Sequence, residues 1–127
     1  MDQSGGMGSE AAKALVRDYF QRLLNERDLS VCDERLSDDY VDHDAAPDTP
    51  PGPASIKAFV ARFLHEYPDM RIEIEDIPAE GDRVAARIVW RGSRRASGEP
   101  HRQMGIIILR LDAQGRIAER WSAYKPL

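Results

Sequence analysis

His43 lies between two aspartates in the segment Tyr40-Val-Asp-His-Asp44, just before a proline-rich stretch. Neighbouring carboxylates make an imidazole hold its proton more tightly, and imidazole is the most frequent general acid or base near neutral pH. We therefore take His43, with Asp44 beside it, as a candidate acid–base pair. The alternative is a solvated loop histidine that makes only local contacts.

Glu119 shares its expected strand face with Ile117 and Trp121. A carboxylate on an apolar face is costly to bury unless it is paired or lines a wet pocket. Glu119 is therefore a candidate acid–base or orienting group, the alternative being an ion-pair partner at a sheet edge or dimer face. His101, which follows Pro100 at the start of a strand, is expected to reach the mouth of a pocket.

The sequence lacks the motifs of metal binding, of covalent serine catalysis and of phosphate binding. Asp42-x-Asp44 resembles the start of a calcium loop, but the glycine and the closing glutamate are absent, and no His-x-x-x-His or Glu-x-x-His pair exists. There is no Gly-x-Ser-x-Gly and no phosphate-cradling glycine loop. The sequence therefore predicts no metal and no cofactor.

Two periods divide the chain. From Ser9 apolar residues recur every three or four positions, which predicts helices, and after Pro68 they alternate, which predicts strands. Helices are expected over 9–28, from 30 onward and over 54–67, and strands over 72–75, 84–91, 104–111 and 116–124, with a short one around 39–42. Helices that precede the strands instead of alternating with them are typical of α+β proteins. We therefore expect a bent, mostly antiparallel sheet that forms a cone with three N-terminal helices. Residues 1–8 are expected to be a disordered leader, and 9–127 one domain.

The same periods indicate which side chains face the inside of the cone. The expected pocket lining consists of the largest apolar side chains on inward faces: Tyr19, Phe59, Phe63, Trp90, Met104 and Trp121. Lys125 lies four residues after Trp121 and is expected to point the same way. Val89, Ile107 and Leu109 are expected on the outer face, where their apolar area predicts a homodimer.

Composition excludes several classes of protein. The 127 residues include 18 basic and 22 acidic ones, a net charge of −4, which argues against a general nucleic-acid binder. No unbroken apolar run exceeds four residues, the length of 106–109, which is far too short to cross a membrane. The single cysteine, Cys32, is expected to be a small core residue. With no signal peptide visible, we expect a cytoplasmic protein.

Six segments in order carry a resemblance to a known family: Tyr40-Val-Asp-His-Asp44, Gly52 before a helix, Glu66-Tyr-Pro-Asp69, Ile74-Glu-Asp-Ile77, Glu80-Gly-Asp-Arg-Val-Ala-Ala-Arg87 and Gly115-Arg-Ile-Ala-Glu-Arg-Trp121. Together they resemble the SnoaL-like polyketide cyclases (ester cyclases) of the nuclear transport factor two-like superfamily. The resemblance implies a cystatin-like cone, usually dimeric.

The resemblance also implies a chemistry. In these cyclases a carboxylate removes a proton between two carbonyls, and a ring closes by intramolecular aldol condensation without a cofactor. His43, Arg87, Trp90 and Trp121 match the family's pocket positions, and Tyr40 opens the same motif as His43. The family's aspartate four residues after the tryptophan corresponds to Lys125.

We therefore expect a small cofactor-free acid–base enzyme that acts on a hydrophobic polyketide-like or cyclic molecule by aldol cyclisation, isomerisation or dehydration. The base would be a relocated group among His43, Asp44, His101, Glu119 and Lys125. The alternative is a non-catalytic small-molecule binding or accessory domain that has lost the aspartate base.

Overall fold

The computed structural model describes residues 8–127, so the leader expected over 1–8 lies, apart from Gly8, outside the described part of the chain. The helices are α1 (Ser9–Phe20), a π-helical turn η1 (Gln21–Asn25), α2 (Ser30–Arg35) and α3 (Ala54–Glu66). The strands are β1 (Leu36–Asp42), β2 (Arg71–Asp76), β3 (Ala79–Glu80), β4 (Arg83–Ser93), β5 (Pro100–Leu111) and β6 (Ile117–Pro126). Among these residues no helix is both long and apolar enough to span a membrane.

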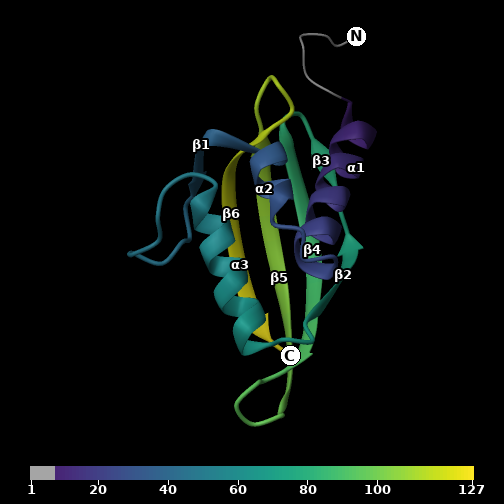
Figure 1. The fold of residues 1–127 in the computed structure, drawn as a ribbon. Coiled ribbons are helices and arrows are strands. Elements are labelled where there is room, and N and C mark those ends of the chain that lie inside the picture. Colours follow the sequence, from purple (N-terminus) through teal and green to yellow (C-terminus); the bar gives the residue numbers. More distant parts are fainter. Residues whose placement is uncertain (1–7) are drawn as a thin grey trace.

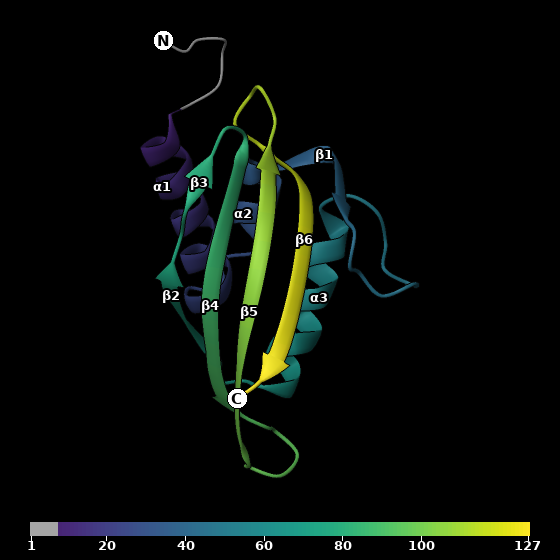
Figure 2. The ribbon, with the colours of Figure 1, turned by 180° about the vertical axis from the view of Figure 1, so that it is seen from behind.

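The strands form one bent, open sheet in the order β1-β6-β5-β4-β2, with β3 also paired to β4. All pairings are antiparallel except that of β1 with β6, which is parallel. The three helices cover one face of the sheet (Figure 1), and no helix of residues 8–127 covers the other face (Figure 2). The expected α+β cone is confirmed, and the short strand expected around 39–42 is the C-terminal half of β1.

The first helix is shorter than expected because its last turn changes type. Regular α-helix ends at Phe20, and the wider π-helical turn that follows buries both Leu23 and Leu24. Asn25 then ends the helix by pairing with the edge of β2. Its side-chain oxygen accepts the N–H of Ile72 at 2.8 Å, and its side-chain amide donates to the Ile72 carbonyl at 3.2 Å. A side chain thus takes the place of a neighbouring strand at this edge.

The inward face of β4 matches the alternation expected from sequence, but that of β5 does not. Trp90 is buried on the helix-covered face, whereas Ile107 and Leu109, expected outside, are buried in the core. Met104 pairs with Val89 on the outer face, so its expected place in the pocket lining is wrong. The reason is that the apolar run 106–109 does not alternate, which leaves the phase of β5 to be set by its neighbours.

A β-bulge at the start of β6 reverses the expected phase of the last strand. Leu111 pairs with Ile117, but the next residue along β5, Arg110, pairs with Glu119, so Ala118 is an extra residue in β6. Ile117 is therefore buried in the core while Glu119 and Trp121 lie on the uncovered face. The inward orientation expected for Glu119, Trp121 and Lys125 is wrong for this one reason.

The core lies between the helices and the inner face of the sheet. Trp90 is its largest fully buried side chain, and the edges of Phe63 and Tyr124 meet its ring at centroid distances of 5.0 and 5.9 Å. Cys32 on α2 is also fully buried, and burial raises the pKa of its thiol to about 11. The structure thus places Cys32 in the core, as the sequence predicts.

The Cys32 thiol should not react with a disulfide reagent such as DTNB in the folded protein at about pH 8. Burial blocks access and suppresses the thiolate, which is the reacting form. We expect stoichiometric reaction only after unfolding in concentrated urea, followed by absorbance. Rapid reaction of the native protein would show that α2 separates readily from the core.

Candidate active site in the cone

The segment Asp42-His43-Asp44 straddles the edge of the sheet where β1 pairs with β6. The backbone N–H of His43 donates to the Arg120 carbonyl at 2.9 Å, and the Ser122 N–H donates to Asp44 Oδ2 at 2.8 Å. Because successive side chains of an extended chain point to opposite faces, His43 lies outside the cone while Asp42 lies inside. The acid–base motif found in the sequence is therefore split between two faces.

On the outer face, His43 is held by two side chains of β6. Its ring stacks on Trp121 with a centroid distance of 4.8 Å and an interplanar angle of 10°, and its Nε2 lies 2.7 Å from Glu119 Oε2. Arg110 donates to the other oxygen of Glu119, and the guanidinium of Arg83 lies 4.8 Å from the Trp121 ring centre. The hydrogen bonds from Arg110 and, second, from His43 lower the pKa of Glu119.

On the inner face, Asp42 faces Arg120. The Arg120 side chain is only 6% exposed, and its Nε lies 3.7 Å from Asp42 Oδ2, beyond hydrogen-bond length. Its Nη2 donates to the Tyr124 hydroxyl, and the other Asp42 oxygen accepts the Asp44 N–H at 3.0 Å. Buried charges normally have all their hydrogen bonds satisfied, so Arg120 is unusual in leaving donors unused.

The polar groups around Arg120 share this lack of partners. The side-chain Nε of Arg120 and the hydroxyls of Tyr40 and Ser55 are buried without a hydrogen-bond partner among the described residues. Burial raises the pKa of Tyr40 and of Tyr19, so both phenols stay neutral and can donate. The inner end of the cone therefore holds hydrogen-bonding capacity that the protein itself does not use.

A cavity of about 350 Å³ opens beside this cluster, between α3, β6 and the loop 43–53. Its lining joins polar side chains to an aromatic wall: Asp42, Asp44, Ala45, Ala46, Thr49, Ser55, Phe59, Arg62, Arg120, Ser122 and Tyr124. A second cavity of about 310 Å³ under the proline-rich loop shares Asp42 and Ser55 and reaches Tyr40. Apolar walls with a few convergent polar groups are typical of small-molecule sites.

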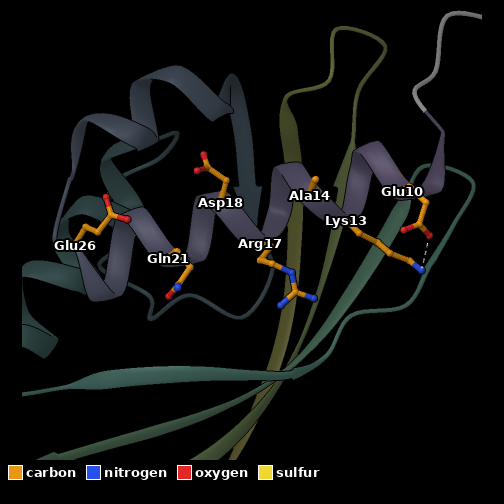
Figure 3. Close-up of a pocket in the computed structure, with 7 residues that line it drawn as sticks. All are labelled: Glu10, Lys13, Ala14, Arg17, Asp18, Gln21 and Glu26. Carbon is orange, nitrogen blue, oxygen red and sulfur yellow. Dashed lines mark hydrogen bonds and ion pairs between the residues drawn. The ribbon is translucent and has the colours of Figure 1, made fainter.

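Other hollows are less suited to a ligand. One of about 520 Å³ runs along α1 and is lined by Glu10, Lys13, Ala14, Arg17, Asp18, Gln21 and Glu26. Figure 3 shows these side chains pointing in different directions rather than toward one centre, with Lys13 paired to Glu10 at 3.2 Å. Within residues 8–127 no cluster of three or more His, Cys, Asp or Glu side chains could hold a metal ion.

The residues expected to act together are dispersed. Asp44 and Phe59 line the larger cavity and Tyr40 the smaller one, while Tyr19, Phe63 and Trp90 form the packed layer behind them. The ring of His101 stacks on that of Tyr67 with a centroid distance of 4.6 Å. His101 lies on β5, four residues before Gly105, which is paired with Tyr124 of β6.

Two further candidates lie on the outer face of the sheet. Arg87 is paired with Glu75 at 2.9 Å, and Lys125 is exposed opposite Met104. Neither belongs to the lining of the cavity.

Sequence reasoning missed Arg120, Tyr124, Ser122 and Ser55, and considered Asp42 only as a metal ligand. The signal that could have found the first three is the row of polar residues at every second position of β6, which becomes an inward row once Ala118 is recognised as a bulge. Two adjacent apolar residues, Ile117 and Ala118, at the start of the strand are the only local hint of that bulge.

Comparisons with known proteins agree with this architecture. The family model of the SnoaL-like domain matches residues 16–120. TsrD from Streptomyces laurentii superposes with a TM-score of 0.83 at 22% identity, covering 94% of this chain and 92% of that one. AclR, a candidate hydroxylase from Streptomyces galilaeus, superposes with a TM-score of 0.80 at 25% identity, covering 93% of this chain and 81% of that one. IdmH, a candidate polyketide cyclase from Streptomyces antibioticus, superposes with a TM-score of 0.75 at 26% identity, covering 90% of this chain and 91% of that one. No curated protein matches the sequence.

Replacing His43 by alanine should lower the free energy of unfolding by about 1–2 kcal/mol, because it removes a ring stack and a charge-assisted hydrogen bond at the β1–β6 edge. Urea denaturation measures this loss. The matched control is His65→Ala, at an exposed position near the end of α3, which should change stability little. Equal effects of the two substitutions would mean that the contact with Trp121 and Glu119 does not hold the edge together.

Proposed function

Because this chain belongs to the SnoaL-like domain family, we propose that it is a small cofactor-free acid–base enzyme of secondary metabolism. Its substrate is a hydrophobic polyketide-like or cyclic molecule bound in the cone, and its reaction an aldol cyclisation, isomerisation or dehydration. The observation that carries the proposal is Arg120, a buried guanidinium with unused donors, 3.7 Å from a carboxylate on the wall of a cavity.

The proposed first step is proton removal by Asp42. The carboxylate takes a proton from the carbon beside a substrate carbonyl, and the electron pair of that C–H bond moves onto the carbonyl oxygen as an enolate. Arg120 and Tyr124 donate hydrogen bonds to this oxygen, where negative charge develops. A guanidinium and a phenolic hydroxyl suit this task because both can donate hydrogen bonds and both line the same cavity.

In a cyclisation the enolate carbon then attacks a second carbonyl of the same molecule. A C–C bond forms, and the proton held by Asp42 passes to the new alkoxide oxygen, so the carboxylate is regenerated. The wall formed by Phe59 and Tyr124 favours this step by folding the chain of the substrate so that its two reacting carbons meet. Asp44 contributes by fixing the loop to Ser122 of β6.

The second candidate function is non-catalytic binding of a small molecule. Lys125 favours it, because this exposed outer-face lysine stands where the resemblance places the family's aspartate base. Under this alternative Asp42 only balances the charge of Arg120.

Asp42→Asn should reduce catalysed proton exchange by about 100-fold or more, since the amide cannot act as a base. The measurement follows by NMR the exchange of the protons beside the carbonyl of 1-tetralone in D₂O, a two-ring ketone that exchanges slowly by itself. Asp48→Asn, at an exposed position in the loop that follows β1, is the matched control and should exchange at the wild-type rate.

A second variant, His43→Gln, should also keep the wild-type rate of proton exchange, because the His43 side chain lies outside the cone. Loss of exchange in His43→Gln with retention in Asp42→Asn would overturn the assignment of the base. Binding of 1-tetralone without any exchange by the wild type would favour the non-catalytic alternative.

We also propose a cytoplasmic homodimer formed through the uncovered face of the sheet (Figure 2), where Val41, Ile106 and Ile108 are 38–46% exposed. Burying these side chains against a second copy would remove their apolar surface from water. Sedimentation should give a dimer at micromolar concentration and a monomer for Ile108→Glu. The control, Ala14→Glu on the exposed side of α1, should stay dimeric, and a monomeric wild type would refute the proposal.

A further inference from the structure

Arg62 lies on the cavity wall and has no acidic partner among residues 8–127. On α3, Phe59 lies four residues after Ser55, and Arg62 lies three residues after Phe59. These spacings place all three on one face of the helix, and all three line the cavity. Lys57 on the same helix pairs with Asp33 at 2.9 Å, and Arg120 faces Asp42, but Arg62 makes no ion pair with any residue of the described chain.

The two carboxylates of the cavity have partners other than Arg62 among the described residues. Asp42 lies against Arg120 and accepts the Asp44 N–H, while Asp44 accepts the Ser122 N–H. The positive charge of Arg62 at the exposed side of the cavity is therefore free to meet a charge on a bound molecule. A guanidinium matches a carboxylate in shape and can hold both of its oxygens.

We propose that the substrate carries a carboxylate and that Arg62 binds it, while the apolar body of the molecule lies on Phe59 and Tyr124. This inference rests on the proposed function only in taking the cavity as the substrate site, because it concerns binding and not the reaction. Arg62 then selects acidic aromatic or polyketide-like molecules over their neutral counterparts, and it fixes which end of the molecule points toward Arg120.

The test compares 2-naphthoate with 2-naphthamide, which has nearly the same shape but no charge, by isothermal titration calorimetry at low salt. The wild type should bind the carboxylate about three- to tenfold more tightly than the amide, a range set by a partly exposed ion pair. Arg62→Gln should abolish this preference by weakening 2-naphthoate alone, and Arg62→Lys should keep part of it. Added salt should reduce the preference of the wild type.

Arg102→Gln is the matched control, because Arg102 is an exposed arginine on β5 outside the cavity lining. It should leave both affinities unchanged, whereas Phe59→Ala should weaken both ligands. A preference that persists in Arg62→Gln, or a wild type that binds 2-naphthoate no better than 2-naphthamide, would overturn the inference.

The two proposals can fail separately. The acid preference should persist in Asp42→Asn, because that substitution removes the base and leaves Arg62 in place. Acid preference without proton exchange in the wild type would refute the proposed reaction and support the role of Arg62. Proton exchange without acid preference would support the proposed reaction and refute the role of Arg62.

Discussion

The extra residue at Ala118 decides which side chains of β6 reach the inside of the cone. Because strand side chains alternate, one inserted residue exchanges the two faces for the rest of the strand. Before the bulge, Ile117 packs in the core; after it, Arg120, Ser122 and Tyr124 face the cavity and Glu119 and Trp121 face outward. The pairing of β6 with its parallel neighbour β1 is also interrupted, since its register shifts between Leu36 and Val41.

That arrangement brings a charged group into the interior, which is costly. Removing a guanidinium from water costs several kcal/mol unless an opposite charge and hydrogen bonds compensate for it. Arg120 is compensated only partly, by Asp42 at 3.7 Å and by one tyrosine hydroxyl, and an apolar side chain would pack there at lower cost. The contribution of Arg120 to stability therefore does not by itself explain why a guanidinium lies there.

The rest of the molecule holds this group in place. Trp90 packs behind Tyr124, and Gly105 on β5 leaves room for the Tyr124 ring, since a Cβ there would come within 2.6 Å of it. On the other face, the stack of His43 on Trp121 and its hydrogen bond with Glu119 fasten the end of β1 to β6, while the Ser122 N–H holds Asp44 at the start of the following loop. A similar fold occurs in proteins described as a candidate cyclase and a candidate hydroxylase, so the fold alone does not specify a function.

The sequence by itself determined the three helices, five of the six strands and the α+β cone, mainly from local hydrophobic periods and from Pro68, where one period ends and another begins. The two-residue strand β3 was not expected, because it is too short to show a period. It also drew attention to the segment 40–44, of which Asp42 and Asp44 line the larger cavity while His43 lies on the outer face. Only the tertiary structure decided which side of the sheet each residue faces. The apolar run 106–109 has no alternation of its own, and a bulge depends on pairing between strands, so neither could be read from one strand alone. For the same reason the sequence placed Glu119, Trp121 and Lys125 inside the cone, whereas the pairing of β5 with β6 places Arg120 and Tyr124 there.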